Sequence, residues 1–144
     1  MIKHTVIGIA ALLGSVSAHA APQWVELPNS VADVTFLDRS AIRAQGEFLD
    51  VNVLRNFDET IALGSDPVSG AAMYSHRSAT LSYLVDCDNR KVALTGWKLF
   101  EGSFGNGNVV WADKNWGKPA FVNASLEESR EIVTSACATS LAAR

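Results

Sequence analysis

The chain has 144 residues, a formal net charge of −3 at neutral pH and a hydrophobic content of 48%. This length suits one domain with a substantial core. The acidic balance and the lack of any basic run argue against a nucleic-acid partner. After the first twenty residues, no segment is apolar enough to span a bilayer, and none forms a basic helix suited to a membrane surface.

Residues 1–20 have the three parts of a secretory signal peptide. Met1-Ile2-Lys3 is a positive start, residues 6–14 are an apolar core, and Ala18-His19-Ala20 is a small-x-small cleavage site. The core is far shorter than the roughly 20 residues that span a bilayer, which disfavours a membrane anchor. We therefore expect cleavage after Ala20 rather than an anchor or a buried helix. Residues 21–144 would then form a single domain in the periplasm or the medium.

Short apolar runs that alternate with Gly, Asn, Asp and Pro clusters predict an antiparallel β domain. The first expected strand is Val34–Asp38, and the second is Phe48–Phe57. In the second strand, the odd-numbered residues from Leu49 to Val53 are apolar and the residues between them are polar. The turn residues of Gly64–Gly70 predict a loop.

A β-hairpin is the clearest local structure, because Thr80–Cys87 and Arg90–Glu101 alternate apolar and polar residues around Asp88-Asn89. We expect those two residues to form the turn. The predicted pairs on the apolar face are Cys87–Arg90, Val85–Val92, Tyr83–Leu94 and Leu81–Gly96. The predicted pairs on the polar face are Asp86–Lys91, Ser82–Thr95 and Thr80–Trp97.

Beyond Gly96 two registers stay open. Strict alternation places Lys98 in the core and leaves Trp97 and Leu99 outside, whereas a bulge at Gly96 reverses this arrangement. Three segments follow in chain order: a second turn at Gly102–Gly107, a returning strand at Asn108–Ala112 and a loop at Lys114–Pro119.

The last segment changes to a helical period. Ser125-Leu126-Glu127-Glu128 has the form of a capping box, in which Ser125 accepts from the amide of Glu128 and the Glu128 side chain reaches back. Both glutamates also suit the positive end of the helix dipole. The expected apolar stripe consists of Leu126, Ile132, Val133, Ala136, Cys137 and Leu141.

Cys87 and Cys137 are the two cysteines, and they allow one pairing. In an oxidising compartment such a pair predicts a disulfide. The bond closes a loop of about 50 residues and contributes about 4 kcal/mol in the chain-entropy model. A redox or nucleophilic thiol is the alternative, but Cys-x-x-Cys and a nearby histidine are absent. The bond would hold the helix on the sheet face that carries Leu81, Tyr83 and Val85, giving an α+β fold.

The mature sequence offers little for catalysis. His76 is its only histidine, and we expect a solvated position in a loop or strand. The Gly-x-Ser-x-Gly motif of many hydrolases is absent. Asp86 and Asp88 are explained by the hairpin, and a calcium or zinc site needs more ligands. We therefore predict no catalytic, cofactor-binding or metal-binding residues.

Two further features have structural explanations. Gly102-x-x-Gly105-x-Gly107 lacks the helix and lysine that follow a phosphate-binding loop, and it predicts a hairpin turn. The four tryptophans could form a binding face or belong to the core. We expect Trp24 in the core and Trp116 exposed, and Trp97 and Trp111 stay open.

Several elements, in order, resemble the bacterial surface-adhesin protein E family over residues 24–138. The most specific are the Asp-Cys-x-x-Arg element of residues 86–90 and a terminal helix with Ala136-Cys137. The other elements are Trp24, Asp38 before Ile42-Arg43, Tyr74-Ser75-x-Arg77, Gly105-x-Gly107, Trp116 and Pro119.

The resemblance implies an antiparallel sheet with a C-terminal helix tied to one face by a disulfide. It also implies a small exported binding protein. The founding adhesin of the family binds host extracellular proteins, dimerises and is lipid-anchored at the outer membrane. The present sequence departs from it at the expected cleavage site, where no cysteine can accept a lipid. No ligand-binding motif carries over residue by residue.

Three functions therefore compete. The first is a non-enzymatic exported binding module, motivated by the resemblance and the sparse catalytic inventory. The second is a periplasmic accessory or structural protein, motivated by the missing lipid acceptor. The third is a small exported hydrolase that uses His76 or a pair of carboxylates.

Overall fold

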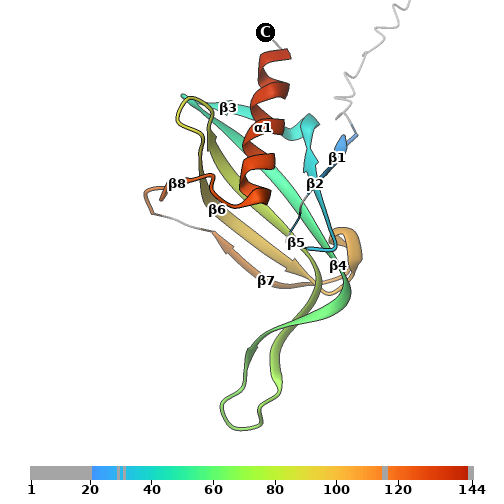
Figure 1. Cartoon of the computed structure of the whole chain (residues 1–144). Coiled ribbons are helices and arrows are strands. Elements are labelled where there is room, and N and C mark those ends of the chain that lie inside the picture. The colour runs from blue at the N-terminus through green and yellow to red at the C-terminus, as the bar shows by residue number, and fades with distance from the viewer. Residues whose placement is uncertain (1–20, 29, 31, 115–116, 143–144) are drawn as a thin grey trace, which may run out of the picture.

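The computed structural model describes residues 21–28, 30, 32–114 and 117–142. An antiparallel sheet forms the body, and a C-terminal helix lies on one of its faces (Figure 1). The elements are β1 (Trp24–Leu27), β2 (Val34–Asp38), β3 (Arg43–Gln45), β4 (Phe48–Ser65), β5 (Ala72–Asp86), β6 (Lys91–Phe100), β7 (Val109–Lys114), β8 (Val122–Asn123) and α1 (Glu127–Ala142). This arrangement confirms the predicted α+β class.

The strands pair in the order β1-β2-β4-β5-β6-β7, with β3 paired to β4 and β8 paired to β6. Strand β2 has the predicted bounds. Strand β4 begins at Phe48 as predicted, but it continues to Ser65, and β5 begins at Ala72 rather than at Thr80. The observed loop, residues 66–71, is one residue shorter than the predicted loop and begins two residues later. The residues on both sides of it belong to the long strands β4 and β5.

The β5–β6 hairpin has the predicted register near its turn and a shifted one beyond it. Asp86 pairs with Lys91, and Tyr83 pairs with Leu94, as expected. The predicted pairs Ser82–Thr95, Leu81–Gly96 and Thr80–Trp97 are wrong, because a bulge next to Gly96 shifts β6 by one residue. The observed pairs are Ser82–Gly96, Leu81–Trp97 and Thr80–Lys98.

The bulge decides which side chains of β6 face the core. Leu99 is buried, Trp97 is partly buried and Lys98 is exposed on the other face. The Thr95 hydroxyl donates to the carbonyl oxygen of Ser82 at 3.1 Å and so satisfies a backbone group beside the irregular pairing. The second of the two registers considered above is therefore the observed one.

The main core lies between α1 and the sheet. Val51 and Val53 of β4 and Val85 of β5 are fully buried in one cluster with Ile132 and Val133 of the helix. Period-2 alternation in the strands and the helical period of α1 bring these side chains to one interface. A second, smaller cluster of Ala79, Leu81 and Leu99 lies farther along the same sheet face.

The predicted helical stripe is correct at its centre and wrong at both ends. Ile132, Val133 and Ala136 are buried. Leu126 is 70% exposed and Leu141 is 72% exposed. Leu126 precedes the first helical residue, and Leu141 lies in the last turn, so the sheet covers neither side chain. Among the described residues, no helix combines the length and apolarity needed to cross a membrane.

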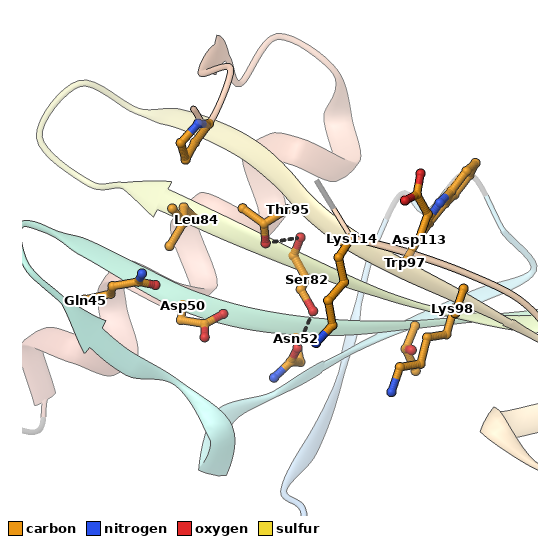
Figure 2. A pocket seen from close by; sticks show the side chains of 14 residues that line it. Gln45, Asp50, Asn52, Ser82, Leu84, Thr95, Trp97, Lys98, Asp113 and Lys114 are labelled. Carbon is orange, nitrogen blue, oxygen red and sulfur yellow. Dashed lines mark hydrogen bonds between the residues drawn. The ribbon is translucent and has the colours of Figure 1, made fainter. Parts of the chain in front are cut away.

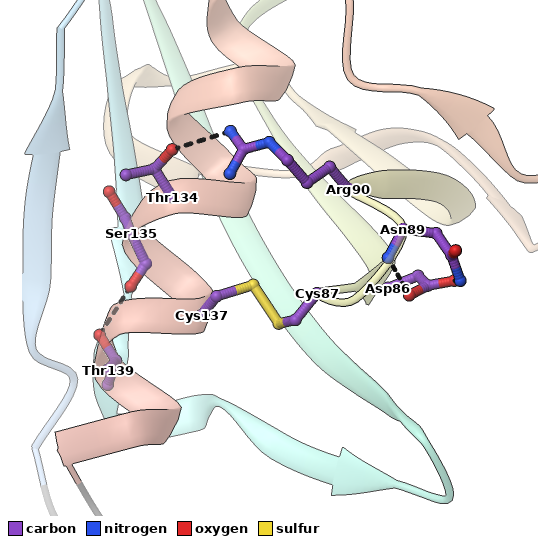
Figure 3. Close-up of a disulfide and its surroundings, with 8 residues drawn as sticks. All are labelled: Asp86, Cys87, Asn89, Arg90, Thr134, Ser135, Cys137 and Thr139. Carbon is purple, nitrogen blue, oxygen red and sulfur yellow. Dashed lines mark hydrogen bonds between the residues drawn. A yellow bond between two sulfur atoms is a disulfide. The ribbon is translucent and has the colours of Figure 1, made fainter.

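Cys87 and Cys137 form the predicted disulfide, with their Cα atoms 5.8 Å apart (Figure 3). Cys87 is the first residue of the turn after β5 and not the last residue of the strand, because the regular pairing ends at Asp86. The same turn contacts the helix again where Arg90 donates to the Thr134 hydroxyl at 3.4 Å. Covalent and polar contacts therefore both hold the middle of α1.

The start of α1 is held by an ion pair with the sheet. The Arg55 guanidinium donates to Oε1 of Glu128, with a distance of 2.9 Å from Nε. Arg55 lies on the helix face of β4, and Glu128 is only 3% exposed. The carboxylate is in the first turn, where the helix dipole favours negative charge. Burial raises the pKa of nearby Tyr83, while Arg55 acts to lower it.

Candidate functional site

The most prominent feature outside the core is the far end of the β4–β5 hairpin, residues 57–77, which we call the ribbon. Figure 1 shows it extending well away from the body as a two-stranded arm. In the part of the chain that the structure describes, its strands pair only with each other, for example at Ile61–His76 and Leu63–Tyr74. The pairing of β2 with β4 and of β6 with β5 stops at Asn56 and Ser78. Both edges of the ribbon therefore present backbone groups outward.

A large break in register separates the ribbon from the sheet. Asn56 pairs with Ser78, but the next pair is Ile61 with His76, so β4 contains three more residues than β5 at this point. Such bulges bend a strand and increase its twist. The ribbon consequently leaves the plane of the sheet instead of extending it.

The base of the ribbon is fixed by hydrogen bonds to the turn between β6 and β7. The Asn56 side-chain oxygen accepts from the Phe104 amide at 2.7 Å. The Ser78 hydroxyl donates to the Gly102 carbonyl at 2.6 Å and accepts from the Gly105 amide at 2.9 Å. Phe104 and Gly105 have φ angles of 54° and 73°. This left-handed pair of residues turns two successive amides toward the buried polar side chains.

Four large apolar side chains are exposed on the ribbon, and no other part of the described chain combines so many on one element. Their exposed fractions are 38% for Ile61, 36% for Leu63, 95% for Val68 and 56% for Met73. Single exposed apolar residues are ordinary, but a group on one projecting element is typical of an interaction surface.

The tip of the ribbon is an ordered turn that presents Val68. The Asp66 carboxylate accepts from the amides of Val68 and Ser69, at 3.1 and 2.6 Å, and from the Ser69 hydroxyl at 2.7 Å. These bonds from Ser69 and Val68 lower the pKa of Asp66. Because Gly70 has a φ of 70°, it completes the turn in a conformation that favours glycine.

The ribbon is acidic as well as apolar. It carries Asp58, Glu59 and Asp66, and no lysine or arginine occurs between Arg55 and Arg77. Arg77 lies at the base and donates to the carbonyl of Asp58 at 2.6 Å. The ribbon therefore combines apolar contact area with carboxylates at its base and its tip.

His76 is buried, and the prediction of a solvated histidine is wrong. It is 6% exposed, and its ring meets that of Phe57 edge-on, with centroids 5.7 Å apart. The bulge in β4 brings Phe57 over the ring, which sequence alternation does not reveal. Burial lowers the pKa of His76. Its Nδ1 has no hydrogen-bond partner within the described residues.

The tryptophans take different positions. Trp24 is 41% exposed, so its predicted place in the core is wrong. Alternation along edge strand β1 turns Leu27 inward and Trp24 outward. Trp97 and Trp111 cover the smaller apolar cluster, and Trp111 packs on Tyr74 with ring centroids 4.9 Å apart. Trp116 lies outside the described residues.

The other predicted sites are structural or lie outside the described part. Ala18 and Ala20 of the expected cleavage site belong to residues 1–20, which the structure does not describe. Asp86 accepts from the amide and the side chain of Asn89, which explains its role in the turn and lowers its pKa. Within the described ranges, no three His, Cys, Asp or Glu side chains gather as a metal site would require.

Comparison with known proteins decides the family. The model of the family described as surface-adhesin protein E matches residues 24–138. This chain belongs to the surface-adhesin protein E family. The match extends from the first residue of β1 into α1, and so it includes the complete sheet and the disulfide.

Solved structures of protein E from Haemophilus influenzae have a similar fold. Crystal form II matches with a TM-score of 0.57 at 14% identity, covering 85% of this chain and 97% of that chain. A second structure of the same protein gives 0.56 at 14% identity, covering 83% and 92%. A structure from a non-typeable strain gives 0.51 at 13% identity, covering 82% and 86%. The comparison with curated proteins finds no match.

Several of the residues that carry the likeness to adhesin E hold the fold together. Asp38 accepts from the Ser40 amide at 3.0 Å and from the Gln23 amide at 3.2 Å, and so caps the short turn after β2. Arg90 and Cys137 connect the hairpin turn to the helix. The family motifs therefore lie mostly in the scaffold: Tyr74-Ser75-x-Arg77 reaches into the ribbon, but none of them covers its exposed Ile61, Leu63 and Val68.

Proposed function

We propose that this chain is an exported, non-enzymatic protein-binding member of the adhesin E family, and that the ribbon makes the contact with its partner. The observation that carries the proposal is a projecting two-stranded arm with four exposed apolar side chains and two open edges. Membership of an adhesin family supports the same function. Host extracellular proteins and proteins of the cell envelope are the two partner classes.

The shape of the ribbon favours recognition of an extended segment. An open strand edge can add a strand from another protein through backbone hydrogen bonds, while side chains at alternate positions select the sequence. Ile61 and Leu63 lie on one face of the ribbon. Met73 lies next to Gly64 on the other face, with its sulfur 3.6 Å from a Cβ built on that glycine. Side chains on both faces of an added strand would therefore lie next to apolar side chains of the ribbon.

The charge of the ribbon favours a basic partner. Asp58 and Glu59 lie at the base of the ribbon and Asp66 at its tip, and the chain has a net charge of −3. Complementary charge raises association rates and excludes acidic competitors. We therefore propose a partner segment that combines apolar residues with lysine or arginine.

Export is a second part of the proposal. The expected signal peptide of residues 1–20 would deliver the domain to an oxidising compartment, where the Cys87–Cys137 disulfide forms. Mass spectrometry of the protein from cells should give a chain that starts at Ala21. A retained N-terminus would contradict this part of the proposal.

Binding is tested with purified residues 21–144 and a panel of immobilised host extracellular-matrix proteins. The ribbon variant carries Ile61→Thr, Val68→Thr and Met73→Thr, which keep β-propensity and remove apolar area. The matched control carries Val122→Thr, Leu126→Thr and Leu141→Thr, which are exposed apolar residues elsewhere. The proposal predicts at least about tenfold weaker binding by the ribbon variant and unchanged binding by the control. Equal binding by both variants contradicts it.

A periplasmic accessory role is the second candidate, because Ala21 and not a cysteine follows the expected cleavage site, where the founding adhesin carries its lipid. Protease treatment of intact cells separates the two functions. If the protein is an adhesin displayed on the cell surface, protease added to intact cells should cleave it. A protein found only in the periplasm and protected in intact cells would exclude adhesion and leave an envelope partner for the ribbon.

A further inference from the structure

A groove of about 750 Å³ lies on the sheet face opposite α1, away from the ribbon (Figure 2). Strands β4, β5, β6 and β7 form its floor, and the polar side chains there include Asp50, Asn52, Thr80, Ser82, Lys98 and Lys114. Its volume is in the range of pockets that hold drug-sized ligands. The segment before β8 borders one end of the groove through Pro119.

One row of paired residues crosses the floor of the groove. Asn52 pairs with Ser82, Ser82 pairs with Gly96, and Gly96 pairs with Lys114. The Lys114 side chain lies beside Gly96, and its Cγ would be in ordinary van der Waals contact, at 3.7 Å, with a Cβ at that position. Figure 2 shows the Lys114 side chain extending across the sheet toward Asn52. A cationic side chain of β7 is therefore directed toward the middle of the face.

A second cation lies in the next row. Lys98 pairs with Thr80, one position from the Gly96–Ser82 pair on the same face. Lys98 and Lys114 are diagonal neighbours on adjacent strands, which places their Cα atoms about 7–8 Å apart. Two flexible ammonium groups at this spacing can contact one anionic group together, and the Thr80 hydroxyl adds a donor beside Lys98.

The opposite end of the groove carries an acceptor. Asp50 lies two residues before Asn52 on β4 and has no hydrogen bond or ion pair with any described residue apart from its strand pairing. Asp113 also borders the groove, but Figure 2 shows it beside Trp97, away from the two lysines. The groove is therefore cationic at β6 and β7, has an amide and hydroxyls in its middle, and ends in a carboxylate at β4.

We propose that this groove binds an acidic oligosaccharide. Lys98 and Lys114 would hold a carboxylate of the sugar, and Asn52 and Ser82 would hydrogen-bond its ring substituents. Asp50 would accept hydrogen bonds from hydroxyls at the far end, which suits a hydroxyl-rich ligand better than a plain anion. This inference is independent of the ribbon, because the two sites share no residue.

The test is calorimetric titration of residues 21–144 with a galacturonic acid tetramer, with neutral maltotetraose and with inorganic phosphate. The proposal predicts that the acidic tetramer binds at least about tenfold more tightly than either of the others. It also predicts that added salt weakens this binding. Equal binding of tetramer and phosphate would reveal a simple anion site and overturn the proposal. So would equal binding of maltotetraose, or no binding of the tetramer at about 5 mM.

Variants locate the site. Lys98→Gln with Lys114→Gln should weaken binding of the acidic tetramer at least about tenfold, while urea unfolding verifies that the fold is intact. Arg130→Gln removes one positive charge from the exposed surface of α1, on the opposite side of the sheet, and should leave binding unchanged. An unchanged affinity in the lysine variant, or an equal loss in the Arg130 variant, would overturn the assignment.

Discussion

At the scale of single residues, buried polar groups in this protein act as connectors between elements. Asn56 and Ser78 fix the turn after β6 to the base of the ribbon. Arg55 and Glu128 connect the sheet to the first turn of the helix. A buried polar group is costly when it loses its partner, so these residues determine where the elements meet.

Removing the Arg55 guanidinium should destabilise the fold. Arg55→Ala leaves the Glu128 carboxylate, which is 3% exposed, without this partner. Breaking a buried ion pair costs about 3–5 kcal/mol, and because Arg55 is itself 25% exposed we expect about 2–3 kcal/mol in urea unfolding. The control is Arg130→Ala, which removes an exposed contact between Arg130 and Glu127 at 4.0 Å. Loss of this contact should cost less than about 0.5 kcal/mol. Equal losses in the two variants would contradict the assigned role.

His76 should make the stability depend on pH. Burial lowers its pKa, so the unfolded chain, with a histidine pKa of about 6.5, binds the proton more readily than the folded one. The contribution of His76 is therefore complete above about pH 6.5 and is lost as the pH falls through the folded value. His76→Phe should show a smaller decrease in unfolding free energy between pH 8 and pH 5.5. An identical decrease in both proteins would contradict this account.

At the scale of elements, α1 depends on the disulfide as well as on its apolar face. The bond joins residues 50 positions apart, and the chain-entropy model gives it about 4 kcal/mol. Ile132, Val133 and Ala136 contribute burial independently of the bond. The helix should therefore stay folded without the disulfide, in a less stable protein.

Reduction measures this contribution. Urea unfolding with a reductant should lose about 4 kcal/mol relative to the oxidised protein. The double variant Cys87→Ser with Cys137→Ser should have the lower stability in both conditions and should not respond to the reductant. A wild-type protein that is equally stable in both conditions would mean that the bond does not form.

At the scale of the whole molecule, a stable body is combined with a projecting arm. Two apolar clusters hold the sheet, the helix and the aromatic residues of β6 and β7 together. The ribbon has only its own two strands, and isolated two-stranded hairpins are marginally stable in water. Its amides should therefore exchange with solvent faster than those of the sheet, while the base at Asn56 and Ser78 should be protected.

The amino-acid pattern predicts the body well and the arm poorly, for a physical reason. Leu49 to Val53 alternate because one face of β4 is buried, and this alternation made the strand recognisable. Apart from His76, which is buried, and Tyr74, which packs on Trp111, most of the ribbon is exposed, so Ile61 and Met73 can occupy opposite faces and no alternation marks the strands. Gly64 and Ser65 therefore resembled a loop.

Other errors come from local irregularities. The bulge beside Gly96 moves the pairing by one residue, and the break after Asn56 buries His76. Neither changes the composition of its strand, so periodicity cannot locate it. The disulfide was predictable because two cysteines allow one pairing, and the helix was predictable because its central apolar stripe follows the helical period.

Hydrogen exchange of the protein alone and saturated with a binding partner from the extracellular-matrix panel tests the role of the ribbon most directly. The ribbon, residues 57–77, should exchange rapidly in the free protein and become strongly protected in the complex, because an added strand pairs its outward amides. Helix α1 should not change. Protection confined to α1 or to the sheet, with a ribbon that exchanges as rapidly as in the free protein, would contradict the proposed contact.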